Sequence, residues 1–379
     1  MKSFALQTSV DNFEAELQSW ADKDIQLAIL FSSKDIIKNG DVLKKFKSIL
    51  PNTELVGCSS SGEIGEGVED DSISLIGVKF ETTKFKCVNT TITDATQSKK
   101  CGQELANSLM GDDLKAVFVL SPGLNVNGSQ LTEGLREVLP MHVSVSGGLA
   151  GDGVAFEDTC TLHNEDMFEN KAIAVGFYGD AVRVTTGSRG GWKPFGPLRR
   201  VTKVENNVLY ELDGKPALDL YKEYLGEKAN ELPASGLLYP FAIMDENNQD
   251  TTGLVRTILD IDEENNSLIL AGDLEEGNMV CLMHANTDEL VSGAEEAAKA
   301  TFQTSEQSED AAIICISCVG RKLVMGDDTE EELDAVREVF GTNSVIAGFY
   351  SYGEISHFQD TGKPELHNQT MTITCISEG

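Results

Sequence analysis

Positive charge is scarce in this chain of 379 residues. It holds 30 Lys and Arg residues against 62 Asp and Glu residues, which gives a formal net charge of −32 at pH 7. A general nucleic-acid binder or a binder of anionic membranes needs cationic patches, so the composition argues against both classes. The excess of acid indicates a strongly solvated surface, with recognition of a specific basic partner as the alternative.

Long apolar runs are missing too. No stretch approaches the roughly 20 apolar residues that span a bilayer, and the start of the chain lacks the apolar core of a signal peptide. The eight cysteines are dispersed and do not form the pattern of a disulfide framework. We therefore expect a reduced, cytoplasmic protein without a membrane segment.

Complete catalytic and metal-binding motifs are also lacking. None of the five histidines has metal-site spacing with another, so the sequence predicts no metal centre. No Gly-rich segment fits a nucleotide-binding pattern. The loop from Gly57 to Gly62 resembles a nucleophile elbow, but Ser61 stands where the pattern requires glycine. Cys315 and Cys318 lie three apart in a predicted strand and so face opposite sides, which is typical of core cysteines.

Three segments do share one pattern, at about residues 25–65, 114–153 and 311–355. Each has a short apolar strand, an amphipathic helix and a second strand that enters a Gly- and Ser-rich loop. Ser129 is the expected helix N-cap in the second segment. In the third segment, Thr329 and Glu332 fit a capping box.

The first and third segments match residue by residue. Both contain G-x-x-S-x-G-E-I, at Gly57–Ile64 and at Gly348–Ile355, which indicates a duplicated domain. A polar break at Glu205-Asn206-Asn207 suggests domains at residues 1–205 and 206–379. The remaining β-branched and aromatic segments predict antiparallel sheet. We expect a mixed α/β (α+β) fold with two related lobes.

The loops are the expected ligand site, because small residues allow a ligand or another backbone to approach closely. An acid and an arginine that face one pocket suit a zwitterion such as an amino acid. For the arginines, a structural ion pair is an equal alternative. The candidate ligand-binding residues are Cys58, Ser59, Ser60, Ser61, Gly62, Glu63, Gly148, Asp152, Arg189, Arg321, Tyr350, Ser351 and Glu354.

These motifs resemble those of the FIST proteins, a two-part bacterial sensory module. The resemblance rests on several long motifs that occur in order over nearly the whole chain, at residues 57–64, 147–152, 209–221, 317–321, 348–355 and 366–370. It implies an intracellular signal-transduction sensor rather than an enzyme, with amino acids as the proposed ligand class. The two halves account for the chain, so the resemblance implies a separate signalling partner, such as a histidine kinase of a two-component system or a cyclase. The resemblance leaves open whether the chain forms a homo-oligomer.

Two other functions remain open at this point. A subset of FIST proteins resembles haem-binding nitric-oxide sensors, and His367 in Leu366-His367-Asn368 is then the candidate axial ligand of a haem cofactor. The third reading is a hydrolase or acyl-transferase that uses Ser60 or Cys58 as nucleophile.

Overall fold

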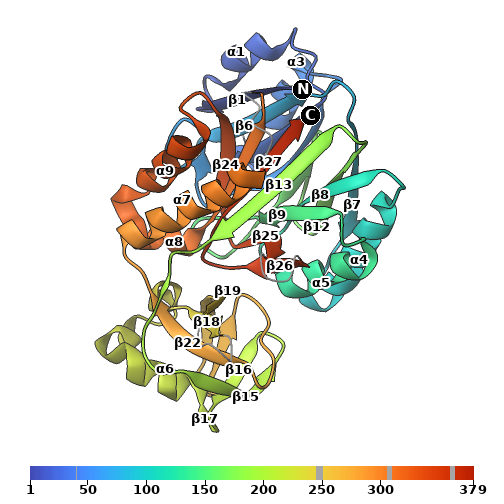
Figure 1. The fold of residues 1–379 in the computed structure, drawn as a ribbon. Coiled ribbons are helices and arrows are strands. Elements are labelled where there is room, and N and C mark those ends of the chain that lie inside the picture. Colours follow the sequence, from blue (N-terminus) through green and yellow to red (C-terminus); the bar gives the residue numbers. More distant parts are fainter. Residues whose placement is uncertain (40, 245–250, 305–309, 359–362) are drawn as a thin grey trace.

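The protein, seen here in a computed structural model, is described for residues 1–39, 41–244, 251–304, 310–358 and 363–379. Its strands form three six-stranded sheets and one nine-stranded sheet. The six-stranded sheets build the larger body, and the strands from β14 to β22, which lie between residues 193 and 284, form the nine-stranded sheet of a smaller body below it (Figure 1). Parallel and antiparallel strand pairs occur together with helices, which confirms the mixed α/β class.

The three six-stranded sheets have the same layout. In the first, the order is β1 (Lys2–Thr8), β6 (Ile73–Lys79), β2 (Leu27–Ser32), β3 (Glu54–Ser59), β10 (Thr161–His163) and β11 (Asp166–Phe168). In the second, it is β7 (Lys84–Thr91), β12 (Lys171–Tyr178), β8 (Leu114–Ser121), β9 (Ser144–Leu149), β25 (Gly353–Phe358) and β26 (Lys363–His367). In the third, it is β13 (Val182–Arg189), β27 (Met371–Glu378), β23 (Ala312–Cys318), β24 (Val345–Ser351), β4 (Glu63–Ile64) and β5 (Val68–Glu69).

The two central strands of each sheet are parallel, and every other neighbouring pair in these sheets is antiparallel. The larger body is therefore built from three equivalent units, where the sequence predicted two related lobes. The sequence shows the strand–helix–strand pattern in all three units, but the second loop has Ala150 and Gly153 in place of the Ser and Glu of the shared motif, so only the first and third units match residue by residue. The backbone of the second unit nevertheless follows the same course.

Each unit also donates a hairpin to a neighbouring sheet. Strand β4, which follows the first loop, pairs with β24 of the third unit. Strand β25, which follows the third loop, pairs with β9 of the second unit. Strand β10, which follows the second loop, pairs with β3 of the first unit. The exchange runs from the first unit to the third, from the third to the second and from the second to the first. Because each exchanged strand follows one loop and pairs with the strand that leads into another, the three loops lie at one junction.

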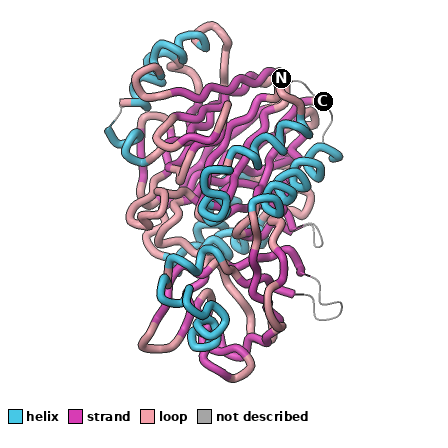
Figure 2. The backbone as a smooth tube through the Cα atoms, turned by 90° about the vertical axis from the view of Figure 1, so that its left-hand side faces the viewer, coloured by secondary structure: helices cyan, strands magenta, loops and turns pink. Residues whose placement is uncertain are grey.

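Helices cover the outer faces of the three sheets, and a shared apolar core lies between the sheets. In that core the rings of Phe31 and Phe349 stack with centroids 4.6 Å apart. The helices of the larger body are α1 (Phe13–Leu17), α2 (Lys34–Asn39), α3 (Val42–Ile49), α4 (Ser98–Leu109), α5 (Gly128–Val138), α7 (Thr287–Thr304), α8 (Val319–Met325) and α9 (Glu330–Phe340). Figure 2 shows helices of this body lying along its strands. Apolar side chains of α3, α5 and α9 pack on the first, second and third sheet respectively.

The smaller body interrupts the third unit between β13 and α7. It contains α6 (Ala217–Leu225) and the strands β14 (Lys193–Pro194), β15 (Arg199–Glu205), β16 (Val208–Leu212), β17 (Lys215–Pro216), β18 (Phe241–Met244), β19 (Thr251–Arg256), β20 (Ile258–Asp262), β21 (Ser267–Leu270) and β22 (Met279–His284). Residues 205 and 206, between which the sequence placed a domain boundary, lie at the turn of the β15–β16 hairpin. The polar break seen in the sequence is thus a tight turn, and Asn206 takes the positive φ (53°) that Asn tolerates.

Two expected helix starts differ from the structure. Asn127, not Ser129, caps α5, because the Asn127 side chain accepts the backbone N–H of Gln130 at 3.0 Å. Thr329 makes no side-chain cap at α9. Glu332 points into the protein instead, so the predicted capping box does not form. Of the helices that lie in the described ranges, none has the length and apolarity needed to cross a membrane.

Candidate ligand-binding site

The three Gly- and Ser-rich loops meet in a ring of backbone hydrogen bonds. The Ser61 N–H donates to the Tyr350 carbonyl at 2.9 Å, the Gly151 N–H donates to Ser59 at 3.1 Å, and the Tyr352 N–H donates to Leu149 at 3.1 Å. In each bond the fifth residue of one loop, counted from its shared glycine, donates to the third residue of another. The loops thus share one junction.

A pocket of about 680 Å³ opens at this junction, beside the first and second loops. Helix α8 supplies a further wall. The residues that line it are Ser33, Lys34, Asp35, Ser60, Ser61, Gly62, Glu63, Asp70, Asp71, Asp152, Gly153, Val154, Ala155, Glu157, Val319, Lys322, Leu323 and Gly326. Five predicted residues, Ser60, Ser61, Gly62, Glu63 and Asp152, therefore come together here.

Glu63 lies at the buried end of the pocket. One carboxylate oxygen accepts the Ser60 hydroxyl, and the other accepts the Ser72 N–H at 2.8 Å and the Ser72 hydroxyl at 3.2 Å. Burial raises the pKa of Glu63 to about 7, because the hydrogen bonds only partly offset the cost of placing a charge out of water. Glu63 therefore changes its charge near neutral pH.

Asp152 shapes the pocket wall. Its carboxylate accepts the backbone N–H groups of Phe156 at 3.0 Å, of Glu157 at 2.8 Å and of Asp158 at 2.8 Å. It also accepts the hydroxyl of Tyr352 from the third loop. Asp152 thus fixes the segment that carries Val154 and Ala155, and its oxygens are already engaged.

Two lysines line the pocket, and sequence reasoning missed both. Lys322 on α8 donates to the Ser61 carbonyl at 3.0 Å and pairs with Asp70. Lys34 pairs with Asp158. Lys322 directly follows Arg321 of the Val319-Gly320-Arg321 motif, which was the one sequence signal that could have found it.

The third loop repeats the carboxylate network of the first. Glu354 accepts the Ser351 hydroxyl at 2.7 Å, the Thr370 N–H at 3.1 Å and the Thr370 hydroxyl at 2.9 Å. Burial raises the pKa of Glu354 to about 8. All four residues of the two networks are buried, but only Glu63 and Ser60 line the pocket, whereas Glu354 and Ser351 do not.

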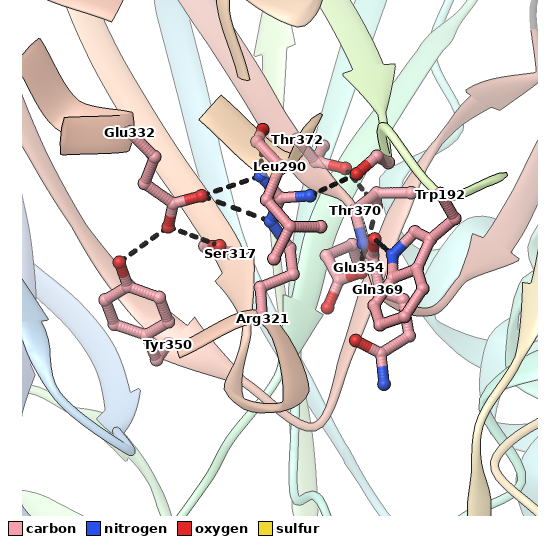
Figure 3. Close-up of polar contacts among 11 residues, drawn as sticks. Trp192, Leu290, Ser317, Arg321, Glu332, Tyr350, Glu354, Gln369, Thr370 and Thr372 are labelled. Atoms are coloured by element: carbon pink, nitrogen blue, oxygen red, sulfur yellow. Dashed lines mark hydrogen bonds and ion pairs between the residues drawn. The ribbon is translucent and has the colours of Figure 1, made fainter. Parts of the chain in front are cut away.

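Arg321 and Tyr350 belong to a buried network rather than to the pocket (Figure 3). The Arg321 guanidinium donates to Glu332 at 2.7 and 3.1 Å. It also donates to the carbonyls of Gly190 at 2.6 Å and Leu290 at 2.8 Å. The Tyr350 hydroxyl donates to the other oxygen of Glu332 at 2.6 Å. The structural ion pair, one of the two alternatives raised for Arg321, is what the structure contains.

The remaining predicted residues lie away from the pocket lining. Cys58 is fully buried in the core, and burial raises the pKa of its thiol well above the ordinary value. The Ser59 hydroxyl accepts the Cys160 N–H at 3.0 Å. Gly148 pairs with Glu354 across β9 and β25. Arg189 ends β13, where its guanidinium donates to the Ser188 carbonyl at 2.8 Å.

The structure places His367, the candidate haem ligand, inside the fold and not in the lining of the pocket. Its side chain is buried, and Nε2 lies 3.2 Å from the Ser356 carbonyl oxygen on the neighbouring strand. Burial lowers its pKa to about 4. Axial ligation by Nε2 would require this ring to give up its contact with the Ser356 carbonyl.

Comparisons with known proteins find two family matches that follow one another along the chain. The FIST N domain matches residues 26–215, and the FIST C domain matches residues 217–357. An uncharacterized protein, MJ1623, of Methanocaldococcus jannaschii is 24% identical over 312 residues, which cover 75% of this chain and 58% of that protein. The chain thus spans little more than half the length of that relative.

A solved structure, that of a cyanuric acid hydrolase from A. caulinodans, aligns over 100% of this chain and 99% of its own. The sequence identity is 8% and the TM-score is 0.39, so this likeness carries no argument about activity. The two family matches together extend over most of the chain, and the chain therefore belongs to the FIST family of signal-transduction sensor domains.

Proposed function

We propose that this chain senses a small molecule that carries an ammonium group, such as an amino acid, in the pocket beside Glu63. The observation that carries the proposal is the charge of the pocket lining. Two lysines face six carboxylates, which belong to Asp35, Glu63, Asp70, Asp71, Asp152 and Glu157. Both lysines already pair with acids. A net negative concave site attracts and concentrates cations.

The pocket also has groups for the rest of an amino acid. Val154, Val319 and Leu323 offer an apolar wall for a side chain. Lys322 can receive a carboxylate if it gives up Asp70, which is exposed and so loses little on release. We therefore retain an amino acid as the proposed ligand, and Lys322 takes the carboxylate-binding role that the sequence assigned to an arginine.

Helix α8 offers a route by which occupancy reaches the rest of the molecule. Lys322 and Leu323 line the pocket. Leu323 and Val324 line a second cavity, of about 420 Å³, together with Phe195, Tyr239 and His284 of the smaller body and its flanks. We propose that a ligand shifts α8 and thereby alters the surface presented to a separate signalling partner, such as a histidine kinase or a cyclase.

The binding proposal is tested by calorimetric titration with amino acids, with the matching amines that lack the carboxylate, and with the matching acids that lack the amine. Amino acids and amines should bind, and the acids should not. E63Q should weaken binding at least tenfold. E354Q is the matched control, because it removes the equivalent carboxylate outside the pocket. Equal losses of affinity in E63Q and E354Q would show that the substitutions act by disturbing the fold, not by removing a ligand contact in the pocket.

The affinity should also depend on pH. A nearby ammonium favours the charged form of a carboxyl group, and Glu63 titrates near pH 7 in the free protein. Affinity should therefore rise as the pH increases through about 7 and level off above it. In E63Q this slope should be absent between pH 6 and 8, and a rise in affinity toward acid pH would contradict an ammonium ligand.

The relay through α8 is tested by the fluorescence of Trp192. This side chain packs in one apolar cluster with Met325 of α8, and its Nε1–H donates to the Gln369 carbonyl at 2.8 Å. With Trp20 replaced by Phe, a bound ligand should change the emission of Trp192. V324A should reduce this change while leaving binding nearly intact, because Val324 packs against the Trp192 cluster and lines the second cavity but not the pocket. An emission that stays constant at saturation would remove α8 as the relay.

A further inference from the structure

Three side chains with metal-ligating atoms meet outside the pocket, between the first and second sheets. Glu54 begins β3, His163 ends β10, and Cys87 lies in β7. Strands β3 and β10 are neighbours in the first sheet, whereas β7 is the edge strand of the second. In the part of the chain that the structure describes, one ligand atom from each residue lies within 4.8 Å of the others. We call these residues the Glu54–Cys87–His163 cluster.

The distances are close to those of a metal centre. Two ligand atoms bound to a tetrahedral zinc ion at about 2.1 Å lie roughly 3.4 Å apart. In the cluster, His163 Nε2 and Glu54 Oε1 are 2.5 Å apart, so this pair needs to open by only about 1 Å. The 4.8 Å limit for the remaining pairs is within reach of small rotations of the side chains.

Cys87 differs from the other cysteines of the chain. Cys58, Cys101, Cys160, Cys281, Cys315, Cys318 and Cys375 are all buried, whereas Cys87 is partly exposed. His163 and Glu54 are partly exposed as well, with 18% and 34% of their side chains accessible. A metal ion from solvent can therefore reach all three ligands.

Two asparagines hold the ligands from outside. Asn89 Nδ2 lies 3.4 Å from His163 Nδ1, and when Nε2 binds an ion the Asn89 amide has to turn over so that its Oδ1 accepts the Nδ1–H. Asn164 donates to Glu54 Oε1 at 3.3 Å, and its own Oδ1 accepts the Leu55 N–H at 3.2 Å. Metal-binding histidines and carboxylates in proteins typically have such outer hydrogen-bond partners, which orient them toward the ion.

We propose that the Glu54–Cys87–His163 cluster binds Zn²⁺ through one sulfur, one nitrogen and one oxygen, with the fourth position open to water. This mixed ligand set suits a borderline-soft ion. As the ion binds, the Cys87 thiol releases its proton to solvent, and the thiolate and the carboxylate together balance the charge of Zn²⁺. The bound ion ties β3 and β10 of the first sheet to β7 of the second.

The experiment uses the reduced full chain, freed of metal with a chelator and titrated with Co²⁺ as a coloured substitute for Zn²⁺. One equivalent should produce a thiolate-to-cobalt charge-transfer band, and one equivalent of Zn²⁺ should abolish it. C87S should remove the band. H163N should weaken Co²⁺ binding by more than the roughly 10–100-fold that the loss of an outer-shell partner costs.

Two controls separate this site from the rest of the molecule. H142N changes an exposed histidine and should leave both band and affinity unchanged. E63Q should do the same, which distinguishes the cluster from weak cation binding in the acidic pocket. Thermal melting of the metal-free variants checks that they fold. If C87S does not fold, the Co²⁺ affinity of H163N still tests the proposal. The absence of a band in the wild type, or an equal band in C87S, would overturn the proposal.

Discussion

Arg321 is fully buried, and Glu332 and two backbone carbonyls together satisfy its guanidinium. A buried charge is tolerated only when its partners replace the water that it loses. The sequence showed an arginine beside a glycine at the end of a strand, which fitted carboxylate binding by a ligand. It could not show that Glu332, eleven residues later, already supplies that carboxylate.

Loss of Arg321 should destabilise the protein strongly. R321A leaves Glu332 buried without its ion-pair partner, which costs about 3–5 kcal/mol in comparable cases. Denaturation by urea would measure the loss. K44A is the control, because it removes an exposed pair with Asp41 and should change stability very little. A loss in R321A as small as that in K44A would contradict a structural role for the buried pair.

At the level of the elements, the central pair of parallel strands is the repeated feature. Gly57, Gly147 and Gly348 occupy the same place in the three units, opposite Leu30, Val119 and Cys315 respectively. A Cβ atom at these glycines would lie 2.0, 1.8 and 1.8 Å from the carbonyl oxygens of those partners. The motif glycines thus allow one backbone to pass close to another. The sequence alone had left open whether the small residues admit a ligand or a second backbone.

Alanine at Gly348 should therefore be poorly tolerated. The clash is with backbone, which cannot move aside as a side chain can, so G348A should cost more than the roughly 1–3 kcal/mol of ordinary overpacking. The thermal midpoint and the yield of folded protein would measure this. G111A is the control, because the nearest atoms to its added methyl group belong to side chains, at 3.3 and 3.7 Å in the Tyr178 ring and at 3.9 Å in the Asp113 carboxylate. Similar midpoints for the two variants would show that the strands can separate at low cost.

At the level of the whole molecule, the net charge of −32 is the dominant electrostatic feature. Self-repulsion of this size disfavours the compact state, and salt weakens it by shortening the range of interaction from about 10 Å at 0.1 M to about 3 Å at 1 M.

The melting temperature should accordingly rise with added NaCl. Calorimetry in NaCl from 0.05 to 1 M at pH 7.5 would measure the trend. The same series with sucrose at matched osmolality separates screening of charge from general exclusion of solute. A melting temperature that is flat or falls with NaCl would show that attractive ion pairs outweigh the repulsion.

The sequence by itself determined the local structure and the family. Apolar runs, helical spacing and turn residues predicted strands and helices near their observed places, and the spaced motifs identified the FIST resemblance. These features are local, because they depend on residues close together in the chain. The loops around Glu63 and Asp152 were found for the same reason.

Tertiary structure alone decided which of those residues meet. Strand exchange around the ring places Lys322 beside Ser61, and of the two equivalent buried carboxylates it leaves Glu63 but not Glu354 in the lining of a pocket. It also brings Cys87 to His163 across two sheets, where no spacing in the sequence indicated a metal centre. Residues far apart in the chain come together only through the pairing of strands, and one sequence carries no direct record of that pairing.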